Sequence, residues 1–501
     1  MTIEFPHPAY ARHVLEPGFR HAQHLLWPHL LAANEAHALM LAETSIIAPE
    51  QASRLIAAQR AIAAGGPEAF EYDPQVEDLF FLVERRLIEL AGADAGGNLQ
   101  IARSRNDLAA TMGRMFLRAR LIDIELLVLR LRSRLISLID AHIDSLMPGI
   151  THTQPAQPTT LAHYLLGVLG PLERDSTRLR QTWERVNHSP LGAAAFTTTG
   201  FPIDRELTAE LLGFDGFIEN GYDAVGAGDH LLEATQCLIT IAASLGRFVN
   251  DLLIWARQES GTFRVGLEFV QISSIMPQKR NPVVLEHIRT RVGYVYGDAN
   301  AVATLVHGAA FGDTNDVEDP VFVPLARAFD AATAVLELLE ATLETAEFNV
   351  ERLAERVGDG FTTATALADG LVHDFGLPFR TAHHITSAAV NAALAVGPGA
   401  TISNEQVRRS AHEITGDDLA ISEEWLARQL DPRAFVAART VPGGPARSAV
   451  EQAVARARIK TDLDAAAVEL GRKRIEDAAE LRSTHVDALV RRSSPELAHR
   501  V

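Results

Sequence analysis

The sequence predicts an all-α protein with three helical domains, of which the central one is a bundle of long helices. Apolar residues make up 47% of the 501 residues and aromatic residues only 6%, a composition typical of helix-rich proteins. Apolar residues recur at steps of three and four through five long segments, and the alternation typical of strands is almost absent. Helices of roughly 25 to 40 residues far exceed the globular mean of about 12. The pattern therefore predicts an elongated bundle.

The first predicted domain, residues 1–105, consists of short helices separated by loops. Glycine and proline interrupt the helical pattern at residues 64–67 (Ala-Gly-Gly-Pro) and again at residues 92–97, which carry three glycines. Both residue types are strong breakers of helices. This region is expected to form a small helical unit in front of the bundle.

The second predicted domain, residues 106–355, contains the five long segments. The first runs from about residue 107 to 146 without a proline, and its apolar stripe consists of Leu117, Leu121, Ile124, Val128, Leu131, Leu135, Leu138 and Ile139. The other four segments cover residues 159–186, 226–260, 282–307 and 320–347. Stripes this long often bury against partner chains, so we expect a homo-oligomer. An extended monomeric bundle is the alternative.

The third predicted domain, residues 356–501, returns to shorter helices. Gly376-Leu377-Pro378 and the Pro442–Pro445 segment break the pattern there. The charged, Ala-rich tail after about Lys460 again has helical periodicity.

Charge and cysteine content exclude several classes of protein. The formal net charge of −18 argues against nucleic acid or an anionic membrane as a partner. Cys237 is the one cysteine, so an intramolecular disulfide is impossible. The N-terminus lacks the basic and then apolar start of a signal peptide, and no apolar stretch is expected to reach transmembrane length. A cytoplasmic location is the resulting expectation.

Residues 273–282, Ser-Ser-Ile-Met-Pro-Gln-Lys-Arg-Asn-Pro, are the most informative segment. Asn281 is expected to cap a helix that has Pro282 at its first position. The polar groups of Ser273, Ser274 and Lys279 would then lie beside the positive end of that helix, where an anion is stabilised. A serine in this setting can act as a base or hold a carboxylate. A polar loop that merely caps the helix is the alternative interpretation.

Two further clusters carry candidate functional groups. Residues 103–107, Arg-Ser-Arg-Asn-Asp, open the first long helix, where arginine opposes the helix dipole unless it pairs with an anion. His152 lies between hydroxyl and amide side chains in the turn before the second long helix and suits proton transfer or carboxylate binding. A solvated helix start and an inert surface histidine are the alternatives. Neither a thiol cluster nor an HExxH pattern supports a metal site.

The decapeptide at residues 273–282 resembles the signature loop of the aspartase/fumarase superfamily, whose members cleave C–N or C–O bonds and release fumarate. Other segments resemble one branch of it, argininosuccinate lyase, and the C-terminal segments separate this branch from adenylosuccinate lyase, aspartase and fumarase. The resemblance spans about residues 75 to 390. The matching segments outside the decapeptide are residues 103–107, 147–158, 190–194, 201–206, 364–369 and 378–385.

The resemblance implies a fumarase/aspartase-like fold and a homotetramer whose active sites are each built from three subunits. By position, Ser273 would remove the Cβ proton of a small-molecule substrate, His152 would support or donate a proton, and Glu286 would orient His152. Lys279 would join these three as a catalytic residue and would also help to bind the carboxylates and the enediolate. The implied substrate-binding residues are Ser104, Arg105, Asn106, Thr151, Gln154, Ser274, Met276, Asn281 and Phe311.

This chemistry needs fixed hydrogen-bond donors and neither a metal nor an organic cofactor. The proton that is removed lies alpha to a carboxylate and is barely acidic, so its loss places extra negative charge on that carboxylate. Donors held around the developing dianion are each worth roughly 10²–10³ in rate. Serine becomes a base only when a neighbouring cation, a helix end and desolvation stabilise its alkoxide.

The sequence also departs from the branch, mainly on one side of the implied site. Ile272 replaces the glycine before the serine pair, Leu108 replaces a glutamine, and Val283 replaces an aspartate. Glu77-Asp78 lacks the histidine that usually follows it. In the loop at residues 311–320, acidic residues dominate, the usual lysine is missing, and Phe311 lies near the position of a tyrosine.

Three hypotheses follow from these matches and departures. The first is a C–N lyase that reversibly eliminates an amine other than arginine from an N-substituted aspartate, because the acidic loop suits a cationic or polyamine-like group. Relatives of this branch, such as ethylenediamine-disuccinate lyase, accept other amines. The second is an authentic argininosuccinate lyase of arginine biosynthesis. The third, of another class, is a catalytically silent structural protein like the lens crystallins recruited from this family.

Overall fold

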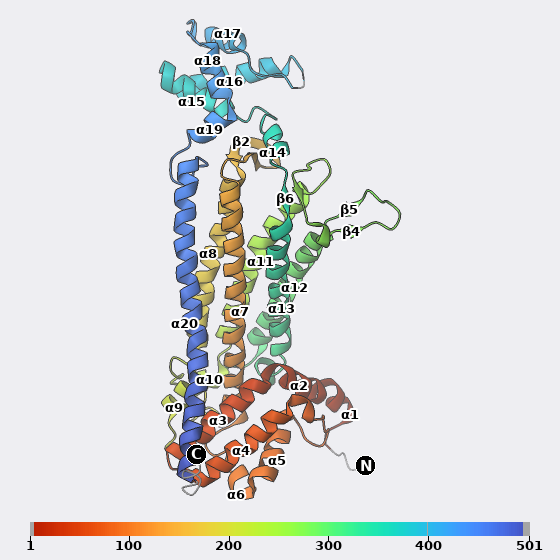
Figure 1. Cartoon of the computed structure of the whole chain (residues 1–501), viewed down its shortest axis with the longest axis vertical. Helices are drawn as coiled ribbons and strands as arrows, with labels where there is room; N and C mark the ends of the chain where they lie inside the picture. Colours follow the sequence, from red (N-terminus) through yellow and green to blue (C-terminus); the bar gives the residue numbers. More distant parts are fainter. Residues whose placement is uncertain (1–4, 398, 494–501) are drawn as a thin grey trace.

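The computed structural model describes residues 5–397 and 399–493, and it has the predicted all-α fold. A bundle of long helices forms the body of the molecule, with one group of shorter helices at each end (Figure 1). The N-terminal helices lie at the lower end in this view, and the short helices between residues 350 and 437 lie at the upper end. The predicted division into three domains remains a prediction, and the first four and last eight residues of its ranges lie outside the described residues.

All five predicted long helices are present. They form a closed ring in which each helix packs against the next, and the last packs back against the first. They are α7 (Arg105–Ala141), α8 (Leu161–Val186), α11 (Asp229–Trp255), α12 (Val283–Gly308) and α13 (Phe322–Thr345). The predicted stripe of α7 lies in the shared core, with Leu138 only partly buried. The apolar periodicity therefore identified the faces that pack.

Shorter helices precede the bundle and have a core of their own. They are α1 (Pro8–Tyr10), α2 (Glu16–His21), α3 (Trp27–Glu43), α4 (Pro49–Gly65), α5 (Leu79–Ala91) and α6 (Ala93–Gly96), with π-helical turns at Ala11–Leu15 and Ala22–Leu26 and a 3₁₀ turn at Pro67–Ala69. Helices α9 (Arg205–Leu211) and α10 (Gly221–Gly226) lie between α8 and α11 in the chain. As expected, helices end at both predicted breaks, α4 at Gly65 and α5 at Ala91, although the short helix α6 lies within the second.

Shorter helices follow the bundle. They are α14 (Val350–Val357), α15 (Ala364–Phe375), α16 (Phe379–Leu394), α17 (Asn404–Thr415), α18 (Glu423–Leu430) and α19 (Pro432–Ala437). Helices α15 to α18 pack around a core of their own, whereas α14 and α19 meet in a smaller cluster that contains Leu146, Val357 and Phe435. We call α15–α19 the C-terminal lobe. A short segment, residues 438–446, leads from this lobe to the last helix.

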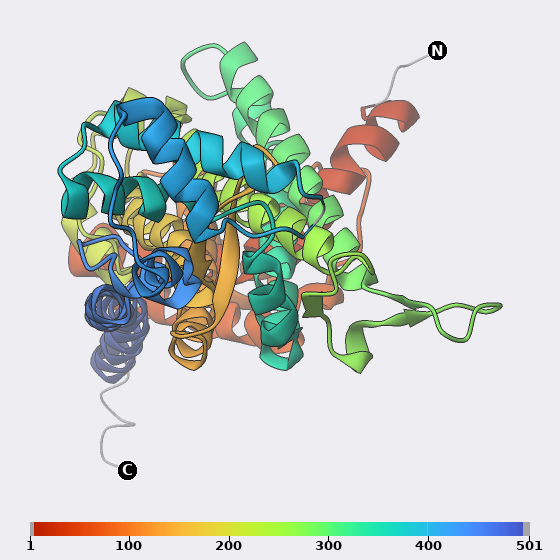
Figure 2. The ribbon, with the colours of Figure 1, turned by 90° about the horizontal axis from the view of Figure 1, so that it is seen from above.

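The last helix, α20 (Arg447–Ser493), leaves the C-terminal lobe and runs along the whole bundle to the N-terminal helices (Figures 1 and 2). It packs against α7 and α8, and its end joins the N-terminal core through Val486 and Leu489. A buried ion pair between Arg132 and Asp464, 2.7 Å apart, links it to α7. The tail is helical as predicted, but it packs against the bundle and not with the helices that precede it in the predicted third domain.

The described residues also form three two-stranded antiparallel sheets, which the sequence pattern does not reveal. Their strands are β1 (Leu146–Thr151) with β2 (Gln154–Thr160), β3 (Phe263–Arg264) with β6 (Glu347–Phe348), and β4 (Gln271–Ile272) with β5 (Arg280–Asn281). Single 3₁₀ turns cover Leu267–Phe269 and Asn315–Val317. Two of these sheets, β1–β2 and β4–β5, are hairpins, and both carry or adjoin candidate catalytic residues.

One expectation about apolar segments needs correction. Among the helices of the described residues, α11 is long and apolar enough to cross a membrane by length and composition alone. It packs between α8 and α12, with Leu238, Leu245 and Leu252 in the core of the bundle. A core helix of a bundle passes such a test because its buried face is apolar.

Candidate active site

Ser104, Arg105 and Asn106 lie at the lower end of the bundle, where α7 begins. Ser104 is the N-cap of α7, and its hydroxyl oxygen accepts the N–H of Asn106 at 3.3 Å. Asp107 accepts the Ser104 N–H at 2.9 Å, which completes a capping box. Serine followed three residues later by an acid is a favourable helix start. The start of the long helix therefore agrees with the prediction.

Asp107 is a further polar residue of this region, and it is not among the site residues predicted from the sequence. Its carboxylate is fully buried and also accepts the N–H groups of Gly192 (2.8 Å) and Ala194 (2.9 Å). Burial raises the pKa of Asp107 to about 6, although these N–H donors oppose the shift. Asp107 thus fixes the loop after α8 to the start of α7. Its position within the Arg-Ser-Arg-Asn-Asp motif is the sequence feature that could have identified it.

Arg105 is already paired with acidic side chains in the chain itself. Its guanidinium lies 2.7 Å from Asp78 and 3.8 Å from Glu77, and it stacks over the ring of Phe81 at 5.0 Å. A substrate carboxylate at this position would have to compete with Asp78. The Glu77-Asp78 pair therefore contacts Arg105, the residue to which the resemblance assigns substrate binding.

A cavity of about 440 Å³ lies beside Arg105, and its lining is mainly apolar but includes four acidic residues, Glu77, Asp78, Glu318 and Asp319, and two histidines, His13 and His21. Burial and the neighbouring carboxylates of Asp319 and Asp313 raise the pKa of Glu318 to about 8. Desolvation and the nearby Asp78 raise the pKa of Asp319 to about 6. Phe311 does not line this cavity and is 70% exposed. The loop at residues 311–320 thus brings acids, and not a lysine, to the lower end of the bundle.

His152 lies at the upper end of the bundle, at the tip of the β1–β2 hairpin. Thr151 pairs with Gln154, so His152 and Thr153 form a two-residue turn in which both have positive φ, 50° and 65°. Left-handed backbone is unfavourable for β-branched threonine and is often found at functional sites. Thr151 to Gln154 are all exposed. The expected turn is therefore a strained hairpin tip that presents His152 to the outside of the chain.

The signature segment forms a second hairpin, which projects from the side of the bundle (Figure 2). The hydroxyl oxygen of Ser273 accepts the N–H groups of Ile275 (3.4 Å) and Met276 (3.1 Å). Ile275 is 82% exposed, and Ser274, Met276 and Lys279 are exposed as well. The loop thus presents Ser274 and Lys279 outward, while Ser273 is half-buried.

The predicted cap at this segment is wrong. Helix α12 begins at Val283 with Pro282 as its N-cap, and Asn281 belongs to strand β5. The Asn281 side-chain amide donates to the backbone oxygen of Gln271 at 3.1 Å and so closes the hairpin. Ile272, which replaces the usual glycine, is extended in β4 opposite Arg280, as suits a β-branched residue.

Glu286 lies in the first turn of α12, also at the upper end, and is exposed. Among the hydrogen bonds of the described residues, none joins Glu286 to His152. Within residues 5–397 and 399–493, no group of three or more His, Cys, Asp and Glu side chains could hold a metal ion. What the chain offers at this end is a histidine, a carboxylate, a lysine and hydroxyls.

The candidate residues therefore form two groups at opposite ends of the bundle (Figure 1). Helix α7 has 37 residues, so about 54 Å separates its ends at a rise of about 1.5 Å per residue. Ser104, Arg105 and the loop at residues 311–320 lie at one end, and His152 and the signature hairpin lie at the other. One chain does not bring these groups together.

Comparison with known proteins decides the family. Residues 20–297 match the family model described as Lyase, and residues 361–437 match the model described as Argininosuccinate lyase C-terminal. The chain belongs to the argininosuccinate lyase branch of the aspartase/fumarase superfamily. It is a carbon–nitrogen lyase that releases fumarate.

Curated relatives and solved structures agree with this assignment. Argininosuccinate lyase 1 of Shouchella clausii is 38% identical over 421 residues, 84% of each chain. Argininosuccinate lyase of Halobacterium salinarum is 40% identical over 440 residues, 87% of this chain and 88% of the relative. The structure of EDDS lyase in complex with formate matches 99% of this lyase and 98% of its own chain at 26% identity, with a TM-score of 0.88. An EDDS lyase double variant with bound fumarate matches with a TM-score of 0.87.

Proposed function

We propose that this lyase eliminates an amine from an N-substituted aspartate, with Ser273 as the general base. Two backbone N–H groups, those of Ile275 and Met276, donate to the Ser273 oxygen. Donors that point at an oxygen favour its negatively charged form. Ser273 also lies on an exposed hairpin that can reach a neighbouring molecule. The arrangement supports an alkoxide in this position.

In the proposed reaction, the Ser273 oxygen takes the Cβ proton, and the electron pair of the broken C–H bond moves onto the adjacent carboxylate. The enediolate that results is stabilised by the donors of Lys279 and Asn281, together with Ser104 and Asn106. The electron pair then forms the C=C bond of fumarate while the C–N bond breaks and the nitrogen takes up a proton. His152, oriented by Glu286, supports this transfer. Fixed donors around the dianion supply the largest part of the rate.

The proposed site is shared between the subunits of a homotetramer. This proposal follows from the separation of the two groups of candidate residues, which lie at opposite ends of α7 and α12. A second chain placed antiparallel would bring the lower end of one bundle beside the upper end of another. The exposed signature hairpin would then complete the site of a neighbour.

The proposed leaving amine is cationic and is not arginine. The cavity beside Arg105 is lined by Glu77, Asp78, Glu318 and Asp319, of which Asp78 is paired with Arg105. The raised pKa of Glu318 leaves it largely protonated at neutral pH in the empty cavity, and a bound cation would favour its ionised form. An arginine leaving group carries its own carboxylate, which these acids would repel. An amine with a second positive charge would be attracted instead. The acidic residues in the lining of this cavity are the observation that supports this part of the proposal.

An authentic argininosuccinate lyase is the second candidate, and the identity of 38–40% to curated argininosuccinate lyases favours it. The two candidates differ in their best substrate. Fumarate release should be measured for argininosuccinate and for ethylenediamine-disuccinate under the same conditions. We expect kcat/KM to be at least about tenfold higher for the diamine compound, the size of effect that one charge interaction provides. A higher kcat/KM for argininosuccinate would contradict the proposal that the leaving amine is not arginine.

Addition of amines to fumarate provides a second, wider test. Diamines, monoamines and amino acids can be supplied with fumarate and the products analysed. We expect diamines to react and amino acids with a free carboxylate to react poorly. The predicted cytoplasmic location also stays a proposal, for which fractionation of the source cells is the test.

A further inference from the structure

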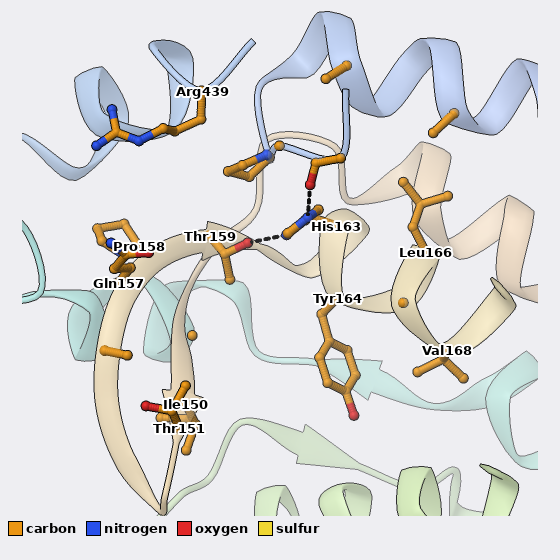
Figure 3. Close-up of a pocket in the computed structure, with 18 of the residues that line it drawn as sticks. Ile150, Thr151, Gln157, Pro158, Thr159, His163, Tyr164, Leu166, Val168 and Arg439 are labelled. Carbon is orange, nitrogen blue, oxygen red and sulfur yellow. Dashed lines mark hydrogen bonds between the residues drawn. The ribbon is translucent and has the colours of Figure 1, made fainter. Parts of the chain in front are cut away.

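The hairpin that carries His152 extends over a cavity of about 990 Å³ (Figure 3). Residues of both strands line this cavity on one side, and residues of α8, α11 and the segment at 438–446 line it on the others. The hairpin residues that line it are Gly149, Ile150, Thr151, Ala156, Gln157, Pro158 and Thr159. Side chains therefore do not pack fully behind the hairpin, and hydrogen bonds at its base have to hold it in place.

His163, in the first turn of α8, makes two such hydrogen bonds (Figure 3). Its Nε2 lies 2.8 Å from the backbone oxygen of Gly443, and its Nδ1 lies 2.8 Å from the hydroxyl of Thr159 in β2. A carbonyl oxygen only accepts, so Nε2 carries the proton. In the neutral ring Nδ1 then accepts the Thr159 hydroxyl. The ring joins the hairpin to the chain that follows the C-terminal lobe.

Both anchors of this bridge are rigid. The His163 N–H is held by the hydroxyl oxygen of the N-cap Thr160 at 3.1 Å. The segment around Gly443 folds back on itself, since the Gly444 N–H donates to Val441 at 2.8 Å. A Cβ on Gly444 would lie 2.2 Å from the backbone oxygen of Arg439, so only glycine fits there. The Gly443 oxygen is therefore presented to His163 in a fixed position.

A second bond ties the same strand to the C-terminal lobe. The Gln157 side-chain amide donates to the hydroxyl of Thr365 in α15 at 3.0 Å. Helix α14 packs against β1, and α19 packs against β2. The base of the hairpin thus follows the position of the helices after residue 350, while its tip at His152 and Thr153 is strained and exposed.

We propose that His163 is a positioning residue. By joining Thr159 to Gly443, it sets the position of β2 relative to the segment 438–446 that follows the C-terminal lobe, and thereby fixes Thr151 and His152 for catalysis. The inference rests on the proposed function only in so far as His152 acts in the reaction. The mechanical part, the effect of His163 on the hairpin, stands on the hydrogen bonds alone.

The test uses full-length His163→Phe and Thr159→Val, each of which removes the bridge. We expect kcat to fall roughly tenfold to a hundredfold, as for small displacements of catalytic groups, with a much smaller change in KM and an altered pH dependence of kcat. The double variant should be little worse than either single variant, because both remove one interaction. His163→Gln keeps a donor for Gly443 and an acceptor for Thr159 and should recover much of kcat. His373→Phe, at a 92% exposed site in α15, is the matched control.

Amide hydrogen exchange of residues 146–160 supplies a readout that does not depend on activity. Faster exchange in this hairpin for His163→Phe, with other regions unchanged, supports the positioning role. Unchanged exchange and an unchanged kcat would overturn the inference, as would a fall in melting temperature with a normal kcat and pH profile. If the wild-type chain has no lyase activity, the proposed function fails, and the exchange experiment still decides the role of His163.

Discussion

Ser104 and His152 lie at opposite ends of α7, with the 37 residues of that helix between them. At about 1.5 Å per residue this is a separation of about 54 Å, far larger than any substituted aspartate. If both residues contact one substrate, they come from different chains. Oligomerisation is then a requirement for catalysis and not only a contribution to stability.

A mixture of two inactive variants is expected to regain activity. Ser273→Ala removes the base at one end of the bundle and Asn106→Ala removes a donor at the other. Where a site takes these two residues from different subunits, random reassembly leaves roughly a quarter of the sites intact. Fumarate release should therefore return to roughly that level after the two variants are dissociated and reassembled together. Mixing without dissociation is the control, and no recovery after verified subunit exchange would contradict a shared site.

Ser273→Ala alone distinguishes an enzyme from a crystallin-like structural protein. Ser273 lies on an exposed hairpin and contacts only nearby backbone N–H groups among its described hydrogen bonds. We expect activity to fall by at least roughly 10²-fold, while the melting temperature stays within about a degree or two, as for other surface substitutions. Ser137→Ala, an exposed serine on α7, is the control. Equal activity of the two variants would remove Ser273 from the mechanism.

The long helices could be predicted from the sequence because their apolar stripes are uninterrupted. The three short sheets could not, since β1 and β2 contain three prolines between them and the other strands have only two residues each. Asn281 followed by proline has the pattern of a helix cap, yet its side chain closes a hairpin. Its bond to Gln271 spans ten residues, and local propensity carries no information about such a bond.

The site residues were identifiable as segments, but their arrangement was not. The sequence marks the Glu77-Asp78 pair and the motif of Arg105 separately, and only the fold shows that Asp78 neutralises Arg105. The helical pattern of the tail is visible as well, although its packing partners are not, because a polar helix can pack against many surfaces. The buried pair of Arg132 and Asp464 joins residues 332 positions apart.

Glu318→Gln is expected to change the pH dependence of stability. The pKa of Glu318 in the folded chain is about 8, against an ordinary value of 4.5. Between these values the folded chain binds a proton that the unfolded chain releases, so wild-type stability falls as the pH rises through this window. The variant avoids this loss and should gain on the order of 2 kcal/mol at the alkaline end, after allowance for solvent screening. Little difference is expected at the acid end.

Denaturant unfolding at a series of pH values measures this difference. Asp316→Asn changes an exposed acid in the same loop and serves as the control. A constant difference between Glu318→Gln and wild type across the window would contradict the raised pKa. In the proposed function, the same variant should also weaken binding of a cationic amine more than binding of a neutral one.

Asp464→Asn tests how α20 is attached to the bundle. The Arg132 side chain is 0% exposed and Asp464 is 3% exposed, so the substitution leaves a buried positive charge without its carboxylate. We expect a loss of roughly 3–5 kcal/mol of stability, measured by denaturant unfolding. Asp462→Asn, exposed on the same helix, should have almost no effect. A pair of apolar replacements, Arg132→Met with Asp464→Leu, should restore much of the loss, and equal stability of the Asn variants would refute the anchoring role.

A crystal structure of the lyase with fumarate bound tests the central claim most directly. The account predicts fumarate in contact with Ser273 and Asn281 of one subunit, Thr151 or His152 of a second, and Ser104 or Asn106 of a third. Fumarate bound within a single subunit and away from the signature hairpin would contradict it.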